Sequence, residues 1–241
     1  FAFLLSRMRC SYPYSCIFLF ASSFTSIIPL WNSPESIIDT SRYFLQAKSL
    51  KEYGIGYFLV EWGRGIDAWT DMPLIPFLYG IIFKLFGELR IYIQVLTTML
   101  FALTTILTFF IGKELWGEET GFSAGLLLMG IPYLLVQVPL MLVDVPVMFL
   151  MALSIYTFIK GLKKGGAWIA FSSIVISLTL FSKYSTWPML SVIPVIAITL
   201  PERDDRKRTL LWASAKIPAA LLFSPSIFNA KADRFIRHLE N

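Results

Sequence analysis

The sequence predicts an all-α polytopic membrane protein whose single domain covers residues 1–241. Three observations favour this fold class. Hydrophobic residues make up 56% of the chain and charged residues only 15%, whereas charged residues are roughly a quarter of a soluble domain. The mean hydropathy is +0.66. Basic residues lie in short runs between apolar segments, which is typical of the cytoplasmic loops of membrane proteins.

The net charge of +5 is explained by this topology, and we expect no nucleic-acid partner, because the basic residues are confined to such loops. The cysteines Cys10 and Cys16 have neither the spacing of a disulfide framework nor that of a metal site, so we interpret them as apolar filler. The chain begins at Phe1 and closes no obvious element at its end, so we expect it to be a fragment of a longer protein.

Seven apolar segments are candidates to cross the bilayer, which needs about 20 mostly apolar residues. They are residues 12–31, 91–112, 121–140, 145–160, 167–182, 186–200 and 210–225. Between the third and fourth segments, Asp144 lies between Pro139 and Pro146, which favours a turn over a continuous helix. Residues 73–87 are shorter and contain Lys84, so we expect them to lie in the membrane interface.

The basic loops predict the orientation of the chain. If residues 73–87 are interfacial, the basic loops 160–166 and 201–209 both face the cytoplasm. Residues 32–90 then form one large extracytoplasmic loop that contains interfacial helices. A signal peptide over residues 1–31 is the competing interpretation, but this apolar run is longer than usual and has no small-residue cleavage pattern.

A surface helix is predicted at the start of the large loop. Its N-cap is Ser33, and Gly54 ends the pattern. Asp39, Arg42 and Tyr43 lie on neighbouring faces of one or two turns of this helix. The alternative is a solvated polar face with only local contacts. The apolar residues near helical spacing are Ile37, Ile38, Leu45 and Leu50.

Four more ionisable residues are predicted to share the extracytoplasmic face with that helix. Asp144 and Lys183 each lie at the outer end of a span, and Asp67 and Asp71 lie in the large loop. Ionisable residues at membrane depth are costly and are therefore candidates for function. The alternatives are that Asp144 caps the following helix and that Lys183 reaches out to lipid headgroups.

A cluster of carboxylates and a lysine at the bilayer surface suits the transfer of a group from a lipid-linked phosphate to a hydroxyl. A carboxylate takes the proton of the hydroxyl or holds a metal, and a cation neutralises the departing phosphate. Asp39 and Lys183 fit these two roles. The lipid tail needs an apolar groove between helices, which the aromatic-rich spans can supply.

Four stretches, in their order and spacing over residues 30–190, resemble the GT-C membrane glycosyltransferases of the dolichyl-phosphate-mannose–protein mannosyltransferase type. This family includes bacterial aminoarabinose lipid A transferases. The stretches are "DTSRYFLQAKSLKEYG", which contains Asp39 and Tyr43, "DMPLIPFLYGIIFKLFG", followed by Arg90, "LMLVDVPVMFLMALSIY", with Asp144, and "LTLFSKYSTWPML", with Lys183.

The resemblance implies a polyprenyl- or dolichyl-phosphate sugar donor, a protein or lipid acceptor, and inversion at the sugar carbon. It implies an integral protein of the plasma or inner membrane, surrounded by membrane lipids, with an extracytoplasmic active site. It also implies that Asp39 is the essential acid, Asp144 a second acidic residue of the site and Lys183 a contact of the donor phosphate. Arg42 and Tyr43 would position the surface helix.

Two departures from the family pattern concern the charge of the site. Thr40 replaces the Glu of the family's Asp-Glu pair, so the need for a divalent metal stays open. Asp71 and Met72 stand where Lys-Pro is usual, so Asp71 is a candidate for the missing carboxylate in substrate binding. Two other function classes remain: a transporter or flippase that binds a coupling ion, and a non-catalytic, degenerate relative.

Overall fold

The computed structural model describes residues 12–32, 34, 38–68, 71–191 and 193, and these residues are helical apart from short connections. The all-α fold class is confirmed for this part of the chain. The elements are α2 (Tyr12–Ile27), the 3-10 helix η1 (Ile28–Asn32), α3 (Ile38–Glu61), α4 (Leu74–Phe86), α5 (Arg90–Trp116), α6 (Glu118–Met129), α7 (Pro132–Gln137), α8 (Asp144–Lys164), α9 (Ala167–Leu180) and α10 (Thr186–Met189).

Among the residues that the structure describes, three helical segments are long and apolar enough to cross a membrane: Tyr14–Asn32, Arg90–Trp116 and Asp144–Lys164. They confirm long apolar helices at the first, second and fourth predicted spans. The helix α9 is apolar but shorter. Residues 210–225 and the end of the 186–200 segment lie outside the described residues, as do Cys10, Ser33 and the loop 201–209, so the count of seven spans stays a prediction.

The third predicted span is wrong as one continuous helix, because residues 121–140 are divided between α6 and α7. The break lies at Gly130 and Ile131. Ile131 is extended (φ −92°, ψ 100°), as expected of a residue that precedes a proline, here Pro132. The turn predicted around Asp144 is confirmed, since α8 begins at that residue after a non-helical segment.

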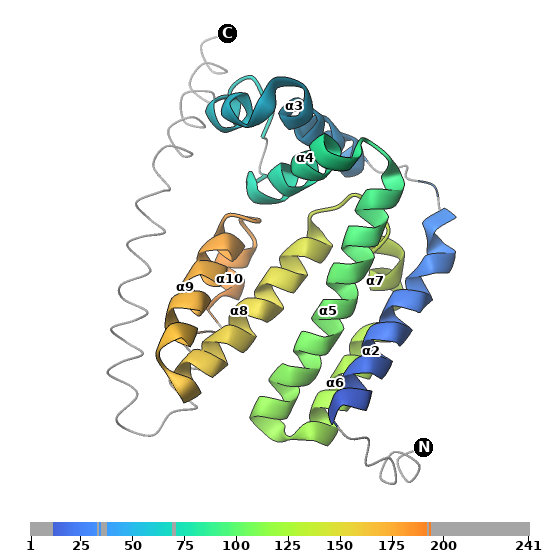
Figure 1. Cartoon of the computed structure of the whole chain (residues 1–241), viewed down its shortest axis with the longest axis vertical. Helices are drawn as coiled ribbons and strands as arrows, with labels where there is room; N and C mark the ends of the chain where they lie inside the picture. Colours follow the sequence, from blue (N-terminus) through green and yellow to red (C-terminus); the bar gives the residue numbers. More distant parts are fainter. Residues whose placement is uncertain (1–11, 33, 35–37, 69–70, 192, 194–241) are drawn as a thin grey trace.

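The helices α2, α5, α8 and α9 form a bundle in which α5 packs against α2, α6 and α8, and α8 packs against α9 (Figure 1). The hairpin of α5 and α6 depends on a close approach at Gly121. A Cβ atom there would lie 2.4 Å from the main-chain oxygen of Phe109, a distance that no real side chain adopts. Glycine therefore sets how closely these helices pack.

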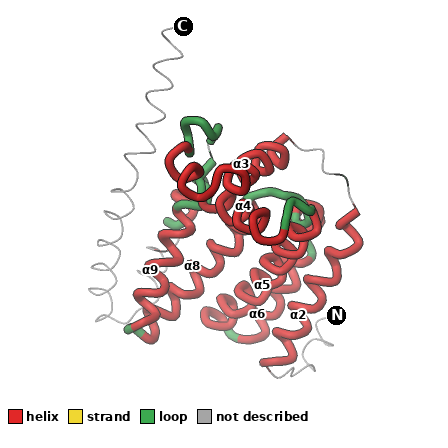
Figure 2. The backbone as a smooth tube through the Cα atoms, turned by 45° about the horizontal axis from the view of Figure 1, so that its top comes forward, coloured by secondary structure: helices red, strands yellow, loops and turns green. Residues whose placement is uncertain are grey.

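The helices α3 and α4 lie across one end of the bundle, and we call this pair the α3–α4 cap (Figures 1 and 2). The two helices touch closely at Gly80, where a Cβ atom would lie 2.7 Å from the Cβ of Leu50 and 2.9 Å from the oxygen of Ala47. The buried Tyr79 hydroxyl donates to the oxygen of Leu142 at 2.6 Å. This bond ties the cap to the turn that precedes α8.

The surface helix ends at Gly54, as predicted. Gly54 is non-helical (φ 87°, ψ 173°), in a conformation that favours glycine, and a second helical segment of α3 follows it to Glu61. Of the apolar residues on this helix, Leu50 is buried, whereas Ile38 and Leu45 are 87% and 63% exposed on the protein surface. The helix α4 packs instead against the face that carries Tyr43, Ala47 and Leu50.

Candidate functional site

An acidic cluster bridged by arginine lies on α3 and on the segment that follows it. The Arg42 guanidinium pairs with two carboxylates, because Nη2 lies 3.1 Å from Asp39 Oδ1 and Nε lies 2.8 Å from Asp71 Oδ2. Asp39 and Arg42 are three residues apart in the first turns of the helix, so their contact follows from helical geometry. Asp39 is half exposed, whereas Asp71 is buried.

The Tyr43 side chain completes the surroundings of the buried carboxylate. Its hydroxyl donates to Asp71 Oδ1 at 3.3 Å and accepts from Arg42 Nη2 at 3.3 Å. Burial, with the nearby Asp71 charge, raises the pKa of Tyr43 well above its ordinary value, so the hydroxyl keeps its proton and remains a donor. Burial lowers the pKa of Arg42, but Tyr43 and Asp71 more than offset this, and the pKa is raised.

The segment around Asp71 pairs with the turn that follows α9. Asp71 and Lys183 form an isolated antiparallel backbone bridge. Nearby, the Leu74 amide donates to the oxygen of Phe181 at 3.3 Å. The main chain of the cap is therefore joined directly to the residue that was predicted to contact a donor phosphate.

A second ion pair lies at the same end of the bundle. Lys183 Nζ donates to Asp144 Oδ1 at 2.6 Å, joining the turn after α9 to the first residue of α8. The Asp144 side chain is 56% exposed and that of Lys183 is 33% exposed. Asp144 does not cap α8, whose N-cap residue is Val143. The pair is open to solvent and lies next to the acidic cluster.

The structure thus connects six of the seven residues singled out on this face by one series of contacts. Side chains link Asp39 to Arg42 and Arg42 to Asp71 and Tyr43, a backbone bridge links Asp71 to Lys183, and an ion pair links Lys183 to Asp144. They come from α3, the α3–α4 connection, the start of α8 and the turn after α9. Three segments that are distant in the sequence therefore meet at the cap.

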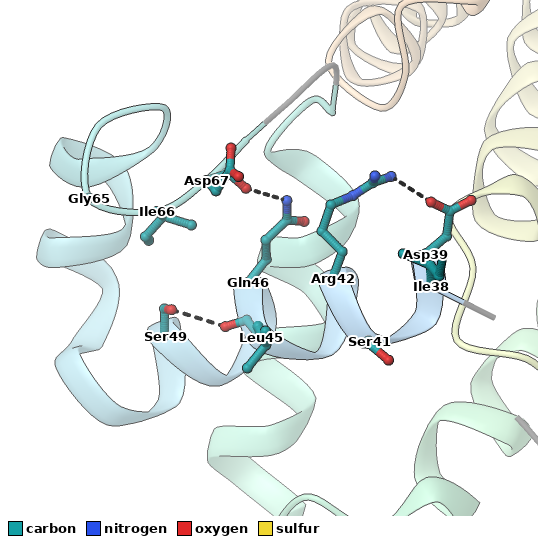
Figure 3. Close-up of a pocket in the computed structure, with 10 residues that line it drawn as sticks. All are labelled: Ile38, Asp39, Ser41, Arg42, Leu45, Gln46, Ser49, Gly65, Ile66 and Asp67. Atoms are coloured by element: carbon teal, nitrogen blue, oxygen red, sulfur yellow. Dashed lines mark hydrogen bonds and ion pairs between the residues drawn. The ribbon is translucent and has the colours of Figure 1, made fainter. Parts of the chain in front are cut away.

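An open groove of about 1000 Å³ runs along the exposed face of α3 (Figure 3). The carboxylates of Asp39 and Asp67 and the guanidinium of Arg42 supply its charged groups, and exposed Ile38 and Leu45 supply apolar surface. The mixture of hydroxyl, amide, carboxylate and aliphatic groups suits a ligand that carries hydroxyls.

Sequence reasoning missed Gln46, which is buried beside the cluster. Its Nε2 donates to the main-chain oxygen of Asp67 at 2.8 Å and to Asp71 Oδ2 at 3.3 Å. A signal was present, because a glutamine three residues after Tyr43 and four after Arg42 lies on the same side of a helix. Asp67 enters the site through this main-chain contact.

A divalent metal does not fit the acidic cluster as it stands. Asp39 and Asp71 both pair with Arg42, so a metal bound between them would have to displace the guanidinium. The part of the chain that the structure describes also contains no group of three or more His, Cys, Asp or Glu side chains able to hold a metal.

Comparison with known proteins assigns the chain to a family. The family model described as dolichyl-phosphate-mannose-protein mannosyltransferase matches residues 70–228. No curated protein and no solved structure matches the chain significantly. The matched residues include Asp71, Asp144 and Lys183, whereas Asp39 precedes them. Because the match covers more than half of the sequence, the chain belongs to the dolichyl-phosphate-mannose-protein mannosyltransferase family, which is of the GT-C type.

Proposed function

We propose that this chain transfers a sugar, with inversion, from a polyprenyl- or dolichyl-phosphate donor to a hydroxyl of a protein or lipid acceptor on the extracytoplasmic side. Membership of the family supports a GT-C-type glycosyltransferase that uses a polyprenyl-phosphate sugar. It also favours this function over the transporter. The observation that carries the proposal is the meeting of Asp39, Arg42, Asp71, Lys183 and Asp144 at one end of the bundle.

The donor phosphate binds at Lys183 in this proposal. The lysine is paired with Asp144 in the structure, and both side chains reach solvent. The donor phosphodiester carries one negative charge, as a carboxylate does, and has two non-bridging oxygens that accept charge-assisted hydrogen bonds, so it can take the place of Asp144 as the partner of the ammonium group. The phosphate monoester that leaves after transfer carries additional negative charge, which the same ammonium group can balance. The released Asp144 carboxylate then lies beside the bound sugar, where it orients the sugar or the acceptor hydroxyl.

Asp39 acts as the general base. Its carboxylate is half exposed and lies on the wall of the groove, where an acceptor hydroxyl can approach it. The hydroxyl proton passes to Asp39 as the acceptor oxygen bonds to the anomeric sugar carbon. The bond from that carbon to the phosphate oxygen breaks in the same displacement, and the lipid phosphate leaves with the electron pair, its charge balanced by Lys183.

Arg42, Tyr43 and Asp71 position the base and bind the substrates. The charge of Arg42 keeps Asp39 and the buried Asp71 compensated, and the Tyr43 hydroxyl satisfies the remaining Asp71 oxygen. A buried carboxylate without such partners would be strongly destabilising. Their shared network fixes the rotamer of Arg42 and, through it, the position of the Asp39 carboxylate in the groove.

Sugar transfer tests this proposal directly. Membranes that contain the full-length protein are incubated with a radiolabelled polyprenyl-phosphate hexose, and donor consumption is compared between wild type and Asp39→Asn at matched expression. We expect Asp39→Asn to lower turnover roughly 100- to 10,000-fold, the usual contribution of a general base. The control is Glu52→Gln, since Glu52 pairs only loosely with Lys48 (3.5 Å) at the surface of the same helix.

An active wild type whose Asp39→Asn variant is equally active would contradict the role of Asp39, and the base would have to be sought at Asp71 or Asp144. A wild-type protein that consumes none of a panel of polyprenyl-phosphate sugars would contradict the proposed function. Retained binding of the lipid phosphate without turnover would then favour the degenerate, non-catalytic relative.

A further inference from the structure

Gln46 is the least exposed polar side chain beside the acidic cluster, with only 2% of its surface exposed. It lies on α3 between the cap interface and the groove, and it contacts the α3–α4 connection at two points. Its Nε2 donates to the oxygen of Asp67 at 2.8 Å and to Asp71 Oδ2 at 3.3 Å. One amide therefore holds both the main chain and a carboxylate of that connection, and Figure 3 shows the first of these contacts, with Asp67.

Chemistry fixes the orientation of this amide. Both partners of Nε2 are acceptors, a main-chain carbonyl and a carboxylate, so the nitrogen and not the oxygen must face them. The Gln46 Oε1 atom is buried and has no hydrogen-bond partner among the described residues. The hydrogen bonds of this buried side chain are therefore those that its nitrogen donates, and its unsatisfied oxygen has a cost in stability.

The charges around Gln46 explain why a neutral donor is needed there. From α3 it faces Arg42, Tyr43 and, beyond Arg42, Asp39, and from the α3–α4 connection it faces Asp67 and Asp71. Lys183 reaches this group through the backbone bridge with Asp71, but its ammonium is paired with Asp144. The site already has more carboxylates than cations, so another acid would repel Asp71.

We propose that Gln46 is the positioning residue for Asp71, and that its neutral amide holds the segment from Asp67 to Asp71 against α3 so that Arg42 and Lys183 keep their places. This inference rests on the proposed function, because the geometry that it maintains is that of the transfer site. Gln46 reaches neither the donor nor the acceptor in this role. It acts through Asp71 and through the backbone that bridges to Lys183.

Two variants separate this role from simple packing. Gln46→Met keeps the length of the side chain but cannot donate, and we expect it to lower kcat about tenfold, the scale of one lost hydrogen bond to a charged group. Gln46→Glu cannot donate when ionised, but its protonated form has one O–H donor. We expect its turnover relative to wild type to rise about tenfold between pH 8 and pH 5.5, as the acid next to Asp71 takes up a proton.

The matched controls are Gln94→Met and Gln94→Glu. Gln94 is also a buried amide, 4% exposed, and donates to a main-chain carbonyl at 2.9 Å, but it lies on α5 and its partner is Trp31 rather than a residue of the acidic cluster. All turnover numbers are taken per folded, monodisperse protein in detergent. Changes at Gln94 report the general effect of altering a buried amide, and we expect neither variant to change the pH profile of turnover.

The outcomes distinguish the inference from the function on which it rests. An active wild type together with full kcat in Gln46→Met, or with a Gln46→Glu profile parallel to wild type, refutes the inference alone. The same pH-dependent rescue in Gln94→Glu also refutes it, since the effect would then be one of stability. A wild type that consumes no donor refutes the proposed function and, with it, the role of Gln46.

Discussion

The two ends of the bundle each carry lysine–carboxylate pairs that join helices, but the pairs differ in burial and in the number of partners. At the cap, Asp144 pairs with Lys183 and is 56% exposed. At the opposite end, the Glu114 side chain is 21% exposed and pairs with Lys160 and Lys163 (Figure 1). Lys163 also donates to the main-chain oxygen of Glu114 at 2.8 Å.

This difference shows how the same chemical pair can serve two purposes. Two lysines hold the carboxylate of Glu114, so this cluster fastens the end of α5 to the end of α8. The exposed pair of Asp144 and Lys183 contributes little to stability, as is usual for surface ion pairs. Its weakness is useful in the proposed function, because a lysine that is to bind a phosphate must be able to leave its carboxylate.

The largest expected effect separates the two ends by turnover. We expect Asp144→Asn to reduce sugar transfer about 100-fold or more, since it removes a charge beside the reacting groups. We expect Glu114→Gln to leave turnover per folded molecule unchanged and to lower the stability by about 1 kcal/mol, because Lys160 and Lys163 lose a charged partner that is only partly buried. Donor consumption and thermal unfolding in detergent measure both quantities. Equal loss of turnover in both variants would show that the pair of Asp144 and the pairs of Glu114 do not differ in function.

The sequence was sufficient to predict those features that depend on local pattern. The long apolar runs predicted α5 and α8, and the prolines around Asp144 predicted the turn before α8. Most of the basic segment 160–166 forms the last turn of α8, at the end opposite the cap, where α5 also turns into α6 (Figure 1). The break between α6 and α7 had a signal in Gly130 and Pro132, but the overall hydrophobicity of the segment concealed it.

What could not be predicted depends on how distant segments pack. The apolar spacing of α3 predicted a surface helix, but it did not predict which face α4 would cover, because that face is set by the close contact that Gly80 permits at Leu50. The candidate residues were expected on one membrane face, yet no pattern in the sequence places the backbone of Asp71 beside that of Lys183. The role of Gln46 depends on that same placement.

A second, smaller effect concerns the contact that holds the cap together. Gly80→Ala would place a Cβ atom 2.9 Å from the oxygen of Ala47, so α3 and α4 must separate. We expect the free energy of unfolding to fall by about 1–3 kcal/mol, the usual cost of overpacking. Relative to wild type, hydrogen exchange in Gly80→Ala should become faster in α3, and more so than in α8. The control is Gly56→Ala, since a Cβ atom at Gly56 has nothing within 4 Å. Equal exchange in wild type and Gly80→Ala would show that the cap does not depend on this contact.

The smallest effect is a pH dependence at the edge of the cap. Glu88 accepts from Lys51 Nζ at 2.6 Å, which lowers the pKa of this carboxyl below its ordinary value. Because the pKa of Glu88 is lowered in the folded state, its ionised carboxylate stabilises that state when the pH is above the ordinary pKa of 4.5. This stabilisation is lost as the pH falls through the lowered pKa. We expect at most about 0.5 kcal/mol for this exposed pair. The measurement is the difference in free energy of unfolding between wild type and Lys51→Met, taken at pH 6 and at pH 3.5. We expect this difference to be smaller at pH 3.5, and a larger advantage of the wild type at pH 3.5 would contradict the prediction.

In the proposed function, the ion pair of Lys183 and Asp144 exchanges its carboxylate for a lipid phosphate, whereas the pairs of Glu114 at the opposite end do not. The most direct test is the binding of polyprenyl phosphate, without sugar, to purified wild type, Lys183→Met and Lys163→Met. We predict that Lys183→Met raises the Kd about 10- to 100-fold, the scale of one hydrogen bond between charged groups. We predict that Lys163→Met leaves the Kd within about twofold, since Lys163 pairs with Glu114 in the structural cluster at the opposite end. Equal weakening by both variants, or an effect of Lys163→Met alone, would contradict the account.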